Sequence, residues 1–456
     1  MNEHPLWLLR DTRKARKQGA SAIMQRQRTR LAEMVSFART HSLYYRKQYQ
    51  DLPEKIEDPQ LLPIVRKQEL MIRFDDWVTD RDVKIEQVRA FVNTPDLIGE
   101  RYLGKYLLAT TSGTTGNRGI FLMDDRAIAV NLSLTLPMMG HWLGVSDVIR
   151  LLAGGGRMAV VVATGGHFLV AAGATRIRKA NPLLRSAVQF FSVHLPLPEL
   201  VAQLNQFRPA IVIGYGSVIQ MLADEQAAGR LHIHPVLLEP AGETLAASEY
   251  DRLARLFHAN VRDVYGATEC PFLSSKCTHG WYHANLDWVV IEAVDANYQP
   301  LPPGEWSHTV LISNLANRVQ PILRYDLGDS ILVRPDPCPC GSSLPAIRVQ
   351  GRAADVLTFP TEGGKQVSIA PLAFATLVDR TPGIELFQIV QTAPTTLRVR
   401  LKTATGSDPE RVWETIHAEI AHLLASSQLE HVTLEHAEEA PEQSPGGKYR
   451  RVLPLN

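Results

Sequence analysis

The stretch Thr110-Thr111-Ser112-Gly113-Thr114-Thr115-Gly116 is rich in hydroxyl groups and glycine, and the apolar run Ile120-Phe121-Leu122-Met123 follows it shortly. Glycine lets backbone N–H groups approach an anion closely, and serine and threonine hydroxyls add donors without bulk. Such a turn can therefore hold the phosphates of a nucleotide. It is not the Walker form, because no Gly-Lys-Ser/Thr sequence closes it. Taken alone it is weak evidence, since many loops share this composition.

Three further segments give this turn a context. They are, in chain order, Asp263-Val264-Tyr265-Gly266-Ala267-Thr268-Glu269, Leu323-Arg324-Tyr325-Asp326-Leu327-Gly328-Asp329 and Ser444-Pro445-Gly446-Gly447-Lys448-Tyr449-Arg450-Arg451. In this order the four segments resemble the motifs of the adenylate-forming enzymes, the superfamily of acyl-CoA synthetases, peptide-synthetase adenylation domains and luciferases. Cys277 to His283, and Cys338-Pro339-Cys340-Gly341 ahead of Gly351-Arg352, resemble the phenylacetate-CoA ligase-like branch.

This resemblance implies a fold and an activity. The fold is α/β: a large N-terminal domain of helix-covered sheets with a barrel-like piece, and a small, mobile α+β C-terminal domain. The activity is ATP-dependent conversion of a carboxylic acid, by family likeness an aryl or arylacetic acid, to an acyl-adenylate and pyrophosphate, followed by transfer to coenzyme A. Two alternatives stay open: an acceptor that is a carrier-protein thiol or an amine, and a non-catalytic nucleotide-binding homologue.

The composition is that of an ordinary globular protein. The chain has 456 residues, of which 45% are hydrophobic and 21% charged, and its formal net charge is +1. Bulk charge therefore gives no reason to expect nucleic-acid or membrane binding. The four cysteines, which include a Cys-x-Cys pair, suit a reduced compartment and metal binding better than a disulfide framework. We expect a soluble cytoplasmic enzyme, and the sequence leaves its oligomeric state open.

The pattern of apolar residues predicts the domain organisation. We expect a large domain over 1–350, beginning with a helical segment over 1–50, and a lid domain over 351–456 with a hinge at about 351–355. Further helices are predicted over 66–73, 85–92, 127–139, 197–206, 219–228, 247–256 and 409–426. Strands are predicted over 107–109, 149–152, 158–162, 210–214, 236–238, 261–264, 289–294, 309–314, 384–391 and 396–402. The alternation of strands and helices from 107 to about 330 indicates parallel sheets covered by helices. The later strands over 289–294 and 309–314 are expected to form a more antiparallel or barrel-like piece.

The resemblance also implies catalytic roles for residues in the motifs. Glu269 would hold Mg²⁺, because a carboxylate is a ligand that this cation prefers, and Thr268 would bind the α-phosphate. Lys448, on a glycine-rich loop, would neutralise charge between the acid and the α-phosphate. Asp329 would accept hydrogen bonds from both ribose hydroxyls. Asp326 stands where the family often has Arg or Lys, so its role is left open.

The remaining site residues are expected around the nucleotide and the acid. Nucleotide contacts are expected from Thr111, Ser112, Gly113, Thr114, Thr115, Gly116, Gly242, Glu243, Tyr265, Gly266 and Arg352. The acid would be lined by Tyr215, Gly216, Ala267 and His167, although a histidine among apolar residues is more often a core residue. Gly351-Arg352 resembles the hinge of the family.

Cys277, His283, Cys338 and Cys340 form two pairs of soft ligands. Three thiolates and one imidazole make a closed tetrahedral set for zinc, which is typical of a structural site. His279 is an alternative to His283 as the nitrogen ligand, and Cys270 is an alternative sulfur that we expect to pack near the active site instead. The cofactors predicted from the sequence are thus ATP, Mg²⁺, coenzyme A and a structural Zn²⁺.

Overall fold

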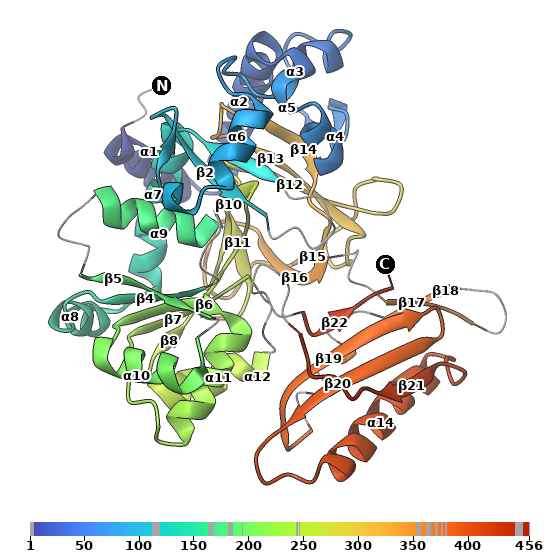
Figure 1. Ribbon diagram of the computed structural model, residues 1–456. Coiled ribbons are helices and arrows are strands. Elements are labelled where there is room, and N and C mark those ends of the chain that lie inside the picture. The colour runs from blue at the N-terminus through green and yellow to red at the C-terminus, as the bar shows by residue number, and fades with distance from the viewer. Residues whose placement is uncertain are drawn as a thin grey trace. The chain divides into compact units, whose positions relative to one another are not determined.

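The computed structural model (Figure 1) describes residues 4–111, 119–162, 167, 169–180, 186–193, 195–242, 245, 247–352, 357–361, 366–369, 373–374, 377–378, 381–442 and 450–455. The chain divides into two compact units. The larger comprises Met1–Leu327 and Ile331–Val349, and the smaller comprises Gly328–Ser330 and Gln350–Asn456.

The larger unit begins with helices, as the sequence predicts over residues 1–50. They are α1 (Pro5–Gln18), α2 (Ala20–His41) and α3 (Leu43–Gln48). Gly19 separates the first two helices with a φ of 87°, a conformation that favours glycine, and the Ser42 hydroxyl caps α3 by accepting from the Tyr45 N–H. The predicted helices α4 (Lys67–Ile72) and α6 (Ile85–Val92) are also present, with the short helix α5 (Phe74–Trp77) between them.

A parallel sheet forms the centre of one half of the larger unit, as the alternating pattern predicts. Its order is β5-β4-β6-β7-β8, with bounds Val188–Ser192, Met158–Val162, Ile211–Tyr215, Leu237–Ala241 and Asn260–Val261. Its helices are α9 (Leu169–Ala180), α10 (Leu197–Phe207), α11 (Gly216–Ala227) and α12 (Ala247–Phe257). Leucines of α10, α11 and α12 share one apolar core with the strands, and Figure 1 shows these helices beside the sheet.

Two strand predictions are wrong. Residues 149–152 lie in helix α8 (Val145–Ala153), which follows α7 (Asp125–Trp142). The apolar side chains of α8 recur at helical spacing, and four of them are exposed, so this segment is a short amphipathic helix at the surface and not a buried strand. Residues 261–264 are not one strand either. β8 ends at Val261 and β9 (Val264–Ala267) begins in a different sheet, because the chain leaves the parallel sheet at this point.

Antiparallel strands build three further sheets, which belong to the larger unit except for residues 329–330 of β15 and 350–352 of β16. One sheet has the order β15-β16-β11-β10-β9, with bounds Asp329–Val333, Ala346–Arg352, Tyr282–Ala284, Cys270–Lys276 and Val264–Ala267. A second contains β12 (Val289–Val294), β13 (Thr309–Asn314) and β14 (Ile322–Asp326), and a third contains β1 (Arg101–Tyr102), β2 (Tyr106–Thr110) and β3 (Ile120–Met123). The strands predicted over 289–294 and 309–314 are β12 and β13, and they pair antiparallel, as expected.

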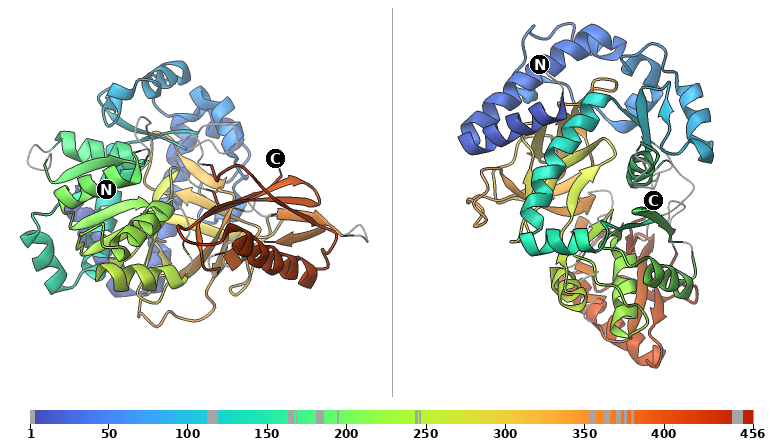
Figure 2. Two further views of the ribbon diagram at one scale, coloured as in Figure 1. Left: turned by 60° about the horizontal axis from the view of Figure 1, so that its bottom comes forward. Right: turned by 90° about the vertical axis from the view of Figure 1, so that its left-hand side faces the viewer.

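The smaller unit has its own core. A four-stranded sheet has the order β21-β20-β19-β22, with bounds Thr433–His436, Thr396–Thr403, Ile384–Ala393 and Val452–Leu453. Helix α14 (Pro409–Ser426) covers one face of it, as Figures 1 and 2 show, and buries Val412, Ile416 and Ile420. The hairpin β17 (Leu357–Pro360) and β18 (Gln366–Ile369) completes this unit.

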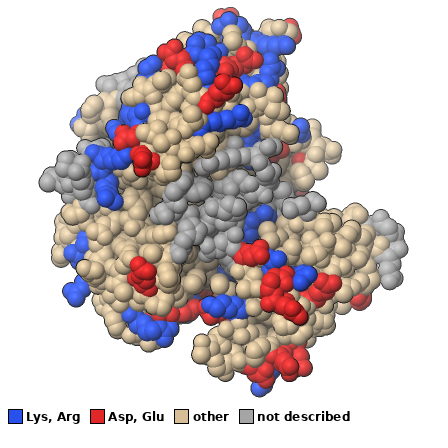
Figure 3. All heavy atoms as spheres, in the orientation of Figure 1, with Lys and Arg blue, Asp and Glu red and all other residues tan. Residues whose placement is uncertain are grey.

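No single helix in the described part of the chain has both the length and the apolar character needed to cross a membrane. α7 and α8, bent by 106° relative to each other, satisfy that test only as a pair. On the face shown in Figure 3, Lys and Arg lie interspersed with Asp and Glu, which fits the formal net charge of +1.

Candidate active site and metal centre

Thr268 and Glu269 form the tip of a tight hairpin between β9 and β10. Ala267 pairs with Cys270, so only these two residues make the turn. Gly266 must be glycine, because a Cβ atom there would lie 2.5 Å from the carbonyl oxygen of Pro271. The local backbone therefore explains the Tyr-Gly-Ala-Thr-Glu spacing, which presents Thr268 and Glu269 together.

Glu269 is held by a second sequence motif. Its residue surface is 8% exposed, and its Oε1 accepts a hydrogen bond of 2.9 Å from the hydroxyl of Tyr325, which lies on β14 and is 2% exposed. The Nδ2 of Asn314 donates to the backbone oxygen of Glu269 at 3.1 Å. Two motifs that are far apart in the sequence thus meet at one carboxylate, and Glu269 is not a solvated surface residue.

The base of the glycine- and hydroxyl-rich turn is fixed between β2 and β3. The Thr111 N–H donates to the Gly119 oxygen at 3.0 Å, and the Gly119 N–H donates to the Thr111 hydroxyl at 2.8 Å. The Leu122 N–H donates to Oε1 of Gln320 at 2.6 Å, which ties β3 to the segment that leads into β14. Ser112, Gly113, Thr114, Thr115 and Gly116 lie outside the described residues, so only the ends of this turn are placed.

The Leu-Arg-Tyr-Asp segment anchors the same region. The Arg324 guanidinium donates to the oxygens of Gln60 (3.0 Å) and Leu62 (2.7 Å), which gives it a structural role away from Glu269. Asp326, whose role the sequence left open, accepts from the hydroxyls of Thr309 (2.6 Å) and Tyr298 (2.8 Å). It therefore fixes the end of β14 just before Gly328, which turns with a φ of 80°, and Asp329, which begins β15.

Several predicted acid-site residues lie at the carboxyl ends of neighbouring parallel strands, which is where α/β sheets bind ligands. Tyr215 ends β6 and pairs with Ala241 at the end of β7. Gly216 begins α11, and Gly242 follows β7 with a φ of 72°. His167 is 1% exposed, and its ring lies 5.5 Å from that of Phe91. These contacts are structural, so a place for His167 in the acid site stays a prediction.

Three other predicted site residues, or their side chains, lie outside the described residues. Lys448, with its glycine-rich loop, and Glu243 lie outside the described residues. Arg352 ends β16, and only its backbone is described. The nucleotide and catalytic roles given to these residues therefore stay predictions.

Asp263, immediately before the β9 motif, is the centre of a buried polar network. Its Oδ2 accepts from the hydroxyls of Tyr250 (2.7 Å) and Tyr282 (2.5 Å), and its Oδ1 lies 3.2 Å from Nζ of Lys276. Burial lowers the pKa of the Lys276 ammonium from its ordinary value, and the nearby Asp263 carboxylate opposes that shift. The network joins α12, β10 and β11 to the start of β9, so it supports the strand that carries Tyr265.

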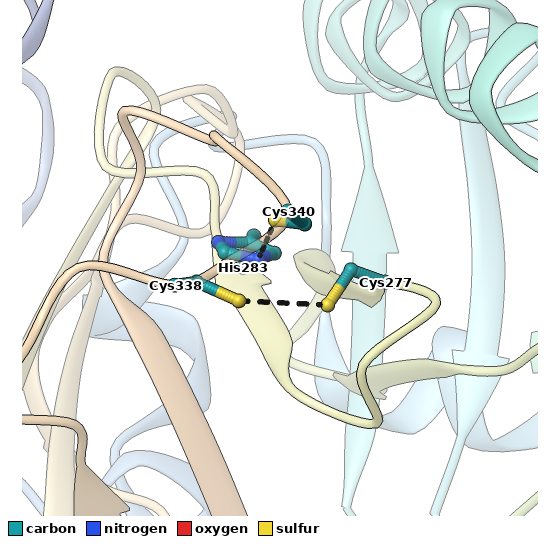
Figure 4. A group of neighbouring side chains, drawn as sticks. All are labelled: Cys277, His283, Cys338 and Cys340. Carbon is teal, nitrogen blue, oxygen red and sulfur yellow. Dashed lines mark hydrogen bonds between the residues drawn. The ribbon is translucent and has the colours of Figure 1, made fainter.

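The four predicted metal ligands come together in the structure. Cys277, His283, Cys338 and Cys340 have their ligand atoms within 4.8 Å of one another (Figure 4). The sulfurs of Cys277 and Cys338 are 3.8 Å apart, which is close to the separation of about 3.8 Å that two Zn–S bonds of about 2.3 Å subtend at a tetrahedral angle. The Cys340 sulfur is 3.1 Å from Nε2 of His283.

The histidine of this cluster is oriented for metal binding. Nδ1 of His283 lies 3.0 Å from the Leu344 oxygen, which fixes the proton on Nδ1 and directs Nε2 toward the sulfurs. Burial lowers the pKa of His283, which favours the neutral ring that a metal requires. His279, the alternative ligand, is exposed and outside the cluster, and Cys270 is fully buried elsewhere, where burial raises the pKa of its thiol.

Comparison with known proteins identifies the fold. No family model matches the chain, and no curated protein matches it. Among solved structures, 2-hydroxyisobutyryl-CoA ligase in the postadenylation state, in complex with 2-HIB-AMP, matches with a TM-score of 0.66 at 20% identity, over 95% of this chain and 89% of that chain. The anthranilate CoA ligase in complex with anthranoyl-AMP matches with a TM-score of 0.54 at 16% identity, over 75% of this chain and 64% of that one.

Fatty acyl-adenylate ligases from E. coli and L. pneumophila match with a TM-score of 0.53 at 15% identity, over 75% of this chain and 67% of that chain. These likenesses confirm the predicted fold: the chain has the α/β architecture of the adenylate-forming ligases, with a large N-terminal and a smaller C-terminal part. The sequence did not reveal that Tyr325 holds Glu269, since the motif that contains Tyr325 does not say which side chain it contacts.

Proposed function

We propose that this chain is an ATP- and Mg²⁺-dependent ligase that activates a carboxylic acid as an acyl-adenylate and transfers the acyl group to coenzyme A. The observation that carries the proposal is the 2.9 Å hydrogen bond from Tyr325 to Glu269, which unites two motifs within a fold shared with solved CoA ligases. By family likeness the acid is an aryl or arylacetic acid.

In the first half-reaction, a carboxylate oxygen of the acid attacks the α-phosphorus of ATP, and the bond to the pyrophosphate leaving group breaks. Two anions must approach, so catalysis rests on positioning and charge neutralisation. A bound Mg²⁺ would neutralise phosphate charge as a Lewis acid. Glu269 fits that cation, because one of its oxygens accepts from Tyr325 and the other has no hydrogen-bond partner in the described residues.

The other motif residues complete the proposed site. Thr111 to Gly116 would hold the outer phosphates, Thr268 the α-phosphate and Asp329 the ribose hydroxyls. Gly242, Glu243, Tyr265 and Gly266 would line the nucleotide, and Lys448 would neutralise charge at the reacting carboxylate. In the second half-reaction the thiolate of coenzyme A attacks the acyl carbon and AMP leaves, with residues 351–355 as the proposed hinge between the two steps.

The cysteine and histidine cluster fits a structural zinc. Three sulfurs and one oriented imidazole give a closed tetrahedral set, which leaves no position for a substrate. The ligands come from β11, from the residue after β10 and from the segment between β15 and β16. A bound ion would therefore tie these strands together in the same sheet that contains β9.

Pyrophosphate release across a panel of carboxylic acids, with ATP, Mg²⁺ and coenzyme A, tests the proposal. We expect release with at least one acid, AMP as the second product and an acyl-CoA identified by mass. Lys448→Ala should lower the rate by about 100-fold or more, because the cation acts on charge that develops in the transition state. Lys402→Ala, which removes an exposed lysine of the smaller unit paired with Glu385, is the matched control and should leave the rate unchanged.

Each outcome of this assay has a meaning. An adenylate that forms without any acyl-CoA would support the alternative acceptors, a carrier-protein thiol or an amine. ATP binding without pyrophosphate release from any acid would support the non-catalytic alternative. Full activity of Lys448→Ala would remove that lysine from the mechanism.

A further inference from the structure

Glu239 is a carboxylate in the middle of an apolar strand. Along β7, Leu238 faces the core shared with α10, α11 and α12, whereas Leu237 packs on the opposite side with Ile213 and Val264. Because side chains alternate along a strand, Glu239 and Ala241 share the face of Leu237. This face is directed away from the helices α10–α12 and toward β9.

The position of Glu239 relates it to the proposed site of the acid. Ala241, at the carboxyl end of β7, pairs with Tyr215, and Gly242 follows it. Glu239 stands two residues earlier on the same face and pairs with Ile213 of β6. One pleat of a strand spans about 7 Å, so the Glu239 backbone lies that far from Ala241, whose partner Tyr215 is predicted to line the acid, and we place the reacting carboxylate at this strand end.

Among the described residues, no positively charged side chain pairs with the Glu239 carboxylate. Among the described residues no hydrogen bond or ion pair to its carboxylate is present, and the charged group that acts on it is Asp263, of the same sign. Asp263 is itself engaged by Lys276 and by two tyrosine hydroxyls. Burial, and then the Asp263 carboxylate, raise the pKa of Glu239 to about 7.

The Glu239 carboxylate lowers the stability of the fold unless a ligand supplies a positive charge. A carboxylate surrounded by protein beside a second carboxylate is unfavourable, and an aliphatic residue would fit the strand without that cost. Part of the residue surface nevertheless remains exposed, so the group can be reached. A cationic ligand would remove the penalty by pairing with Glu239.

We propose that Glu239 binds a protonated amine of the acid substrate, and that this amine is several bonds away from the reacting carboxylate. The inference rests on the proposed function and names the substrate class of that same site. The distance of about 7 Å along the strand is too long for an amine on the α-carbon, and it suits an ω-amino or aminomethyl-aryl acid. Ile213, on the same face, and Val264 of β9, which packs against that face, would contact the apolar part between the two ends.

Matched acid pairs that differ only in the amine test the proposal. They are 4-(aminomethyl)benzoate against 4-ethylbenzoate, and 5-aminopentanoate against hexanoate. In acid-dependent pyrophosphate release, we expect the wild type to prefer the amine in at least one pair by about 10- to 100-fold in kcat/KM. Glu239→Gln and Glu239→Leu should abolish or reverse that preference. 2-Aminohexanoate, with its amine on the α-carbon, should gain nothing over hexanoate.

A matched control and a binding arm separate this inference from the proposed function. Glu225→Gln removes a carboxylate of α11, one that pairs with Arg230, and should leave the preference for the amine unchanged. Non-reacting acyl-sulfamoyl adenosine analogues of each acid pair are titrated calorimetrically into the full chain. The amine analogue should bind the wild type about 10-fold or more tighter, and Glu239→Leu should lose this difference.

The outcomes are distinct. Equal binding of the two analogues to the wild type, or an amine preference that survives in Glu239→Leu, overturns the inference. Pyrophosphate release from the neutral acids would then leave the proposed function standing. Conversely, tight Glu239-dependent binding of the amine analogue without pyrophosphate release from any acid supports the amine site and removes the proposed activity.

Discussion

The larger unit holds two enclosed carboxylates in different circumstances: Glu269 at the tip of the β9–β10 hairpin, and Glu239 in the middle of β7. Glu269 accepts a hydrogen bond from Tyr325 at 2.9 Å, so the protein itself fixes the orientation of the group. Glu239 has no such partner in the described residues, and Asp263 repels its charge. A carboxylate oriented by its own chain suits a metal ion, whereas one that lacks a partner suits a ligand that brings the cation.

Removing the charge of each carboxylate should show most clearly that Glu269 and Glu239 have different roles. We expect Glu269→Gln to lower kcat/KM for every acid by about 100-fold or more, because the neutral amide is a poor ligand for Mg²⁺. Glu239→Gln should instead change which acid is preferred, without a uniform loss. Steady-state pyrophosphate release measures both variants with the same acids. A uniform loss of kcat/KM for every acid in both variants would show that the two carboxylates have the same role.

Removing a ligand from the cysteine and histidine cluster should lower the stability of the fold rather than change the chemistry of the active site. We expect the purified chain to contain about one zinc per molecule by metal analysis, and Cys338→Ser to lose it and to lower Tm by roughly 5–10 °C. His279→Ala is the control, since His279 lies outside the cluster, and it should keep both zinc and Tm. Wild-type protein that contains no zinc, and that gains no Tm when zinc is added, would contradict the structural-zinc proposal.

The hydrogen bond from the Tyr325 hydroxyl should help Glu269 to bind Mg²⁺. Tyr325→Phe keeps the buried ring but removes the hydrogen bond, so we expect the Mg²⁺ concentration needed for half-maximal activity to rise by about 10-fold. The KM for the acid should stay the same, which a general loss of structure would not produce. Tyr44→Phe removes an equivalent hydroxyl, one that donates to Glu69 at 2.7 Å in the N-terminal helices, and should leave the Mg²⁺ requirement unchanged.

The smallest expected effect is the pH dependence of stability at Glu239. Its pKa in the folded chain is about 7 against an ordinary 4.5, so the folded state holds the proton more tightly between these values. Stability from this group is therefore complete below about pH 4.5 and falls as pH rises toward 7. In urea unfolding, Glu239→Gln should be more stable than wild type at pH 8 by about 1–3 kcal/mol, and the difference should shrink at pH 5. A constant difference at both pH values would contradict the raised pKa.

Much of the fold could be predicted from the sequence where the local pattern is unambiguous. The strands Met158–Val162, Val289–Val294 and Thr309–Asn314 and the helix Pro409–Ser426 have the predicted bounds, because turn residues flank a clear periodicity. Helix α8 was missed because its apolar stripe is exposed, so the residues that suggested a buried strand are not in a core. Periodicity alone cannot tell which face of a short segment is covered.

Part of the candidate site could also be predicted from the sequence, and part could not. The four candidate metal ligands could be predicted because ligand chemistry restricts the residue types, and the structure brings the same four together. The contact between Tyr325 and Glu269 could not, since it depends on how two hairpins pack. Glu239 has a sequence signal, a lone acid directly after the apolar run Val236-Leu237-Leu238, but its meaning depends on Asp263, which the fold brings near it.

The central claim is that an acid carboxylate displaces pyrophosphate from ATP on this chain. Its most direct test uses an accepted acid labelled with oxygen-18 in the carboxylate, incubated with ATP, Mg²⁺ and coenzyme A, and mass analysis of the nucleotide product. The account predicts AMP that carries one heavy oxygen from the acid. Unlabelled AMP, or heavy oxygen found only in inorganic phosphate, would contradict it.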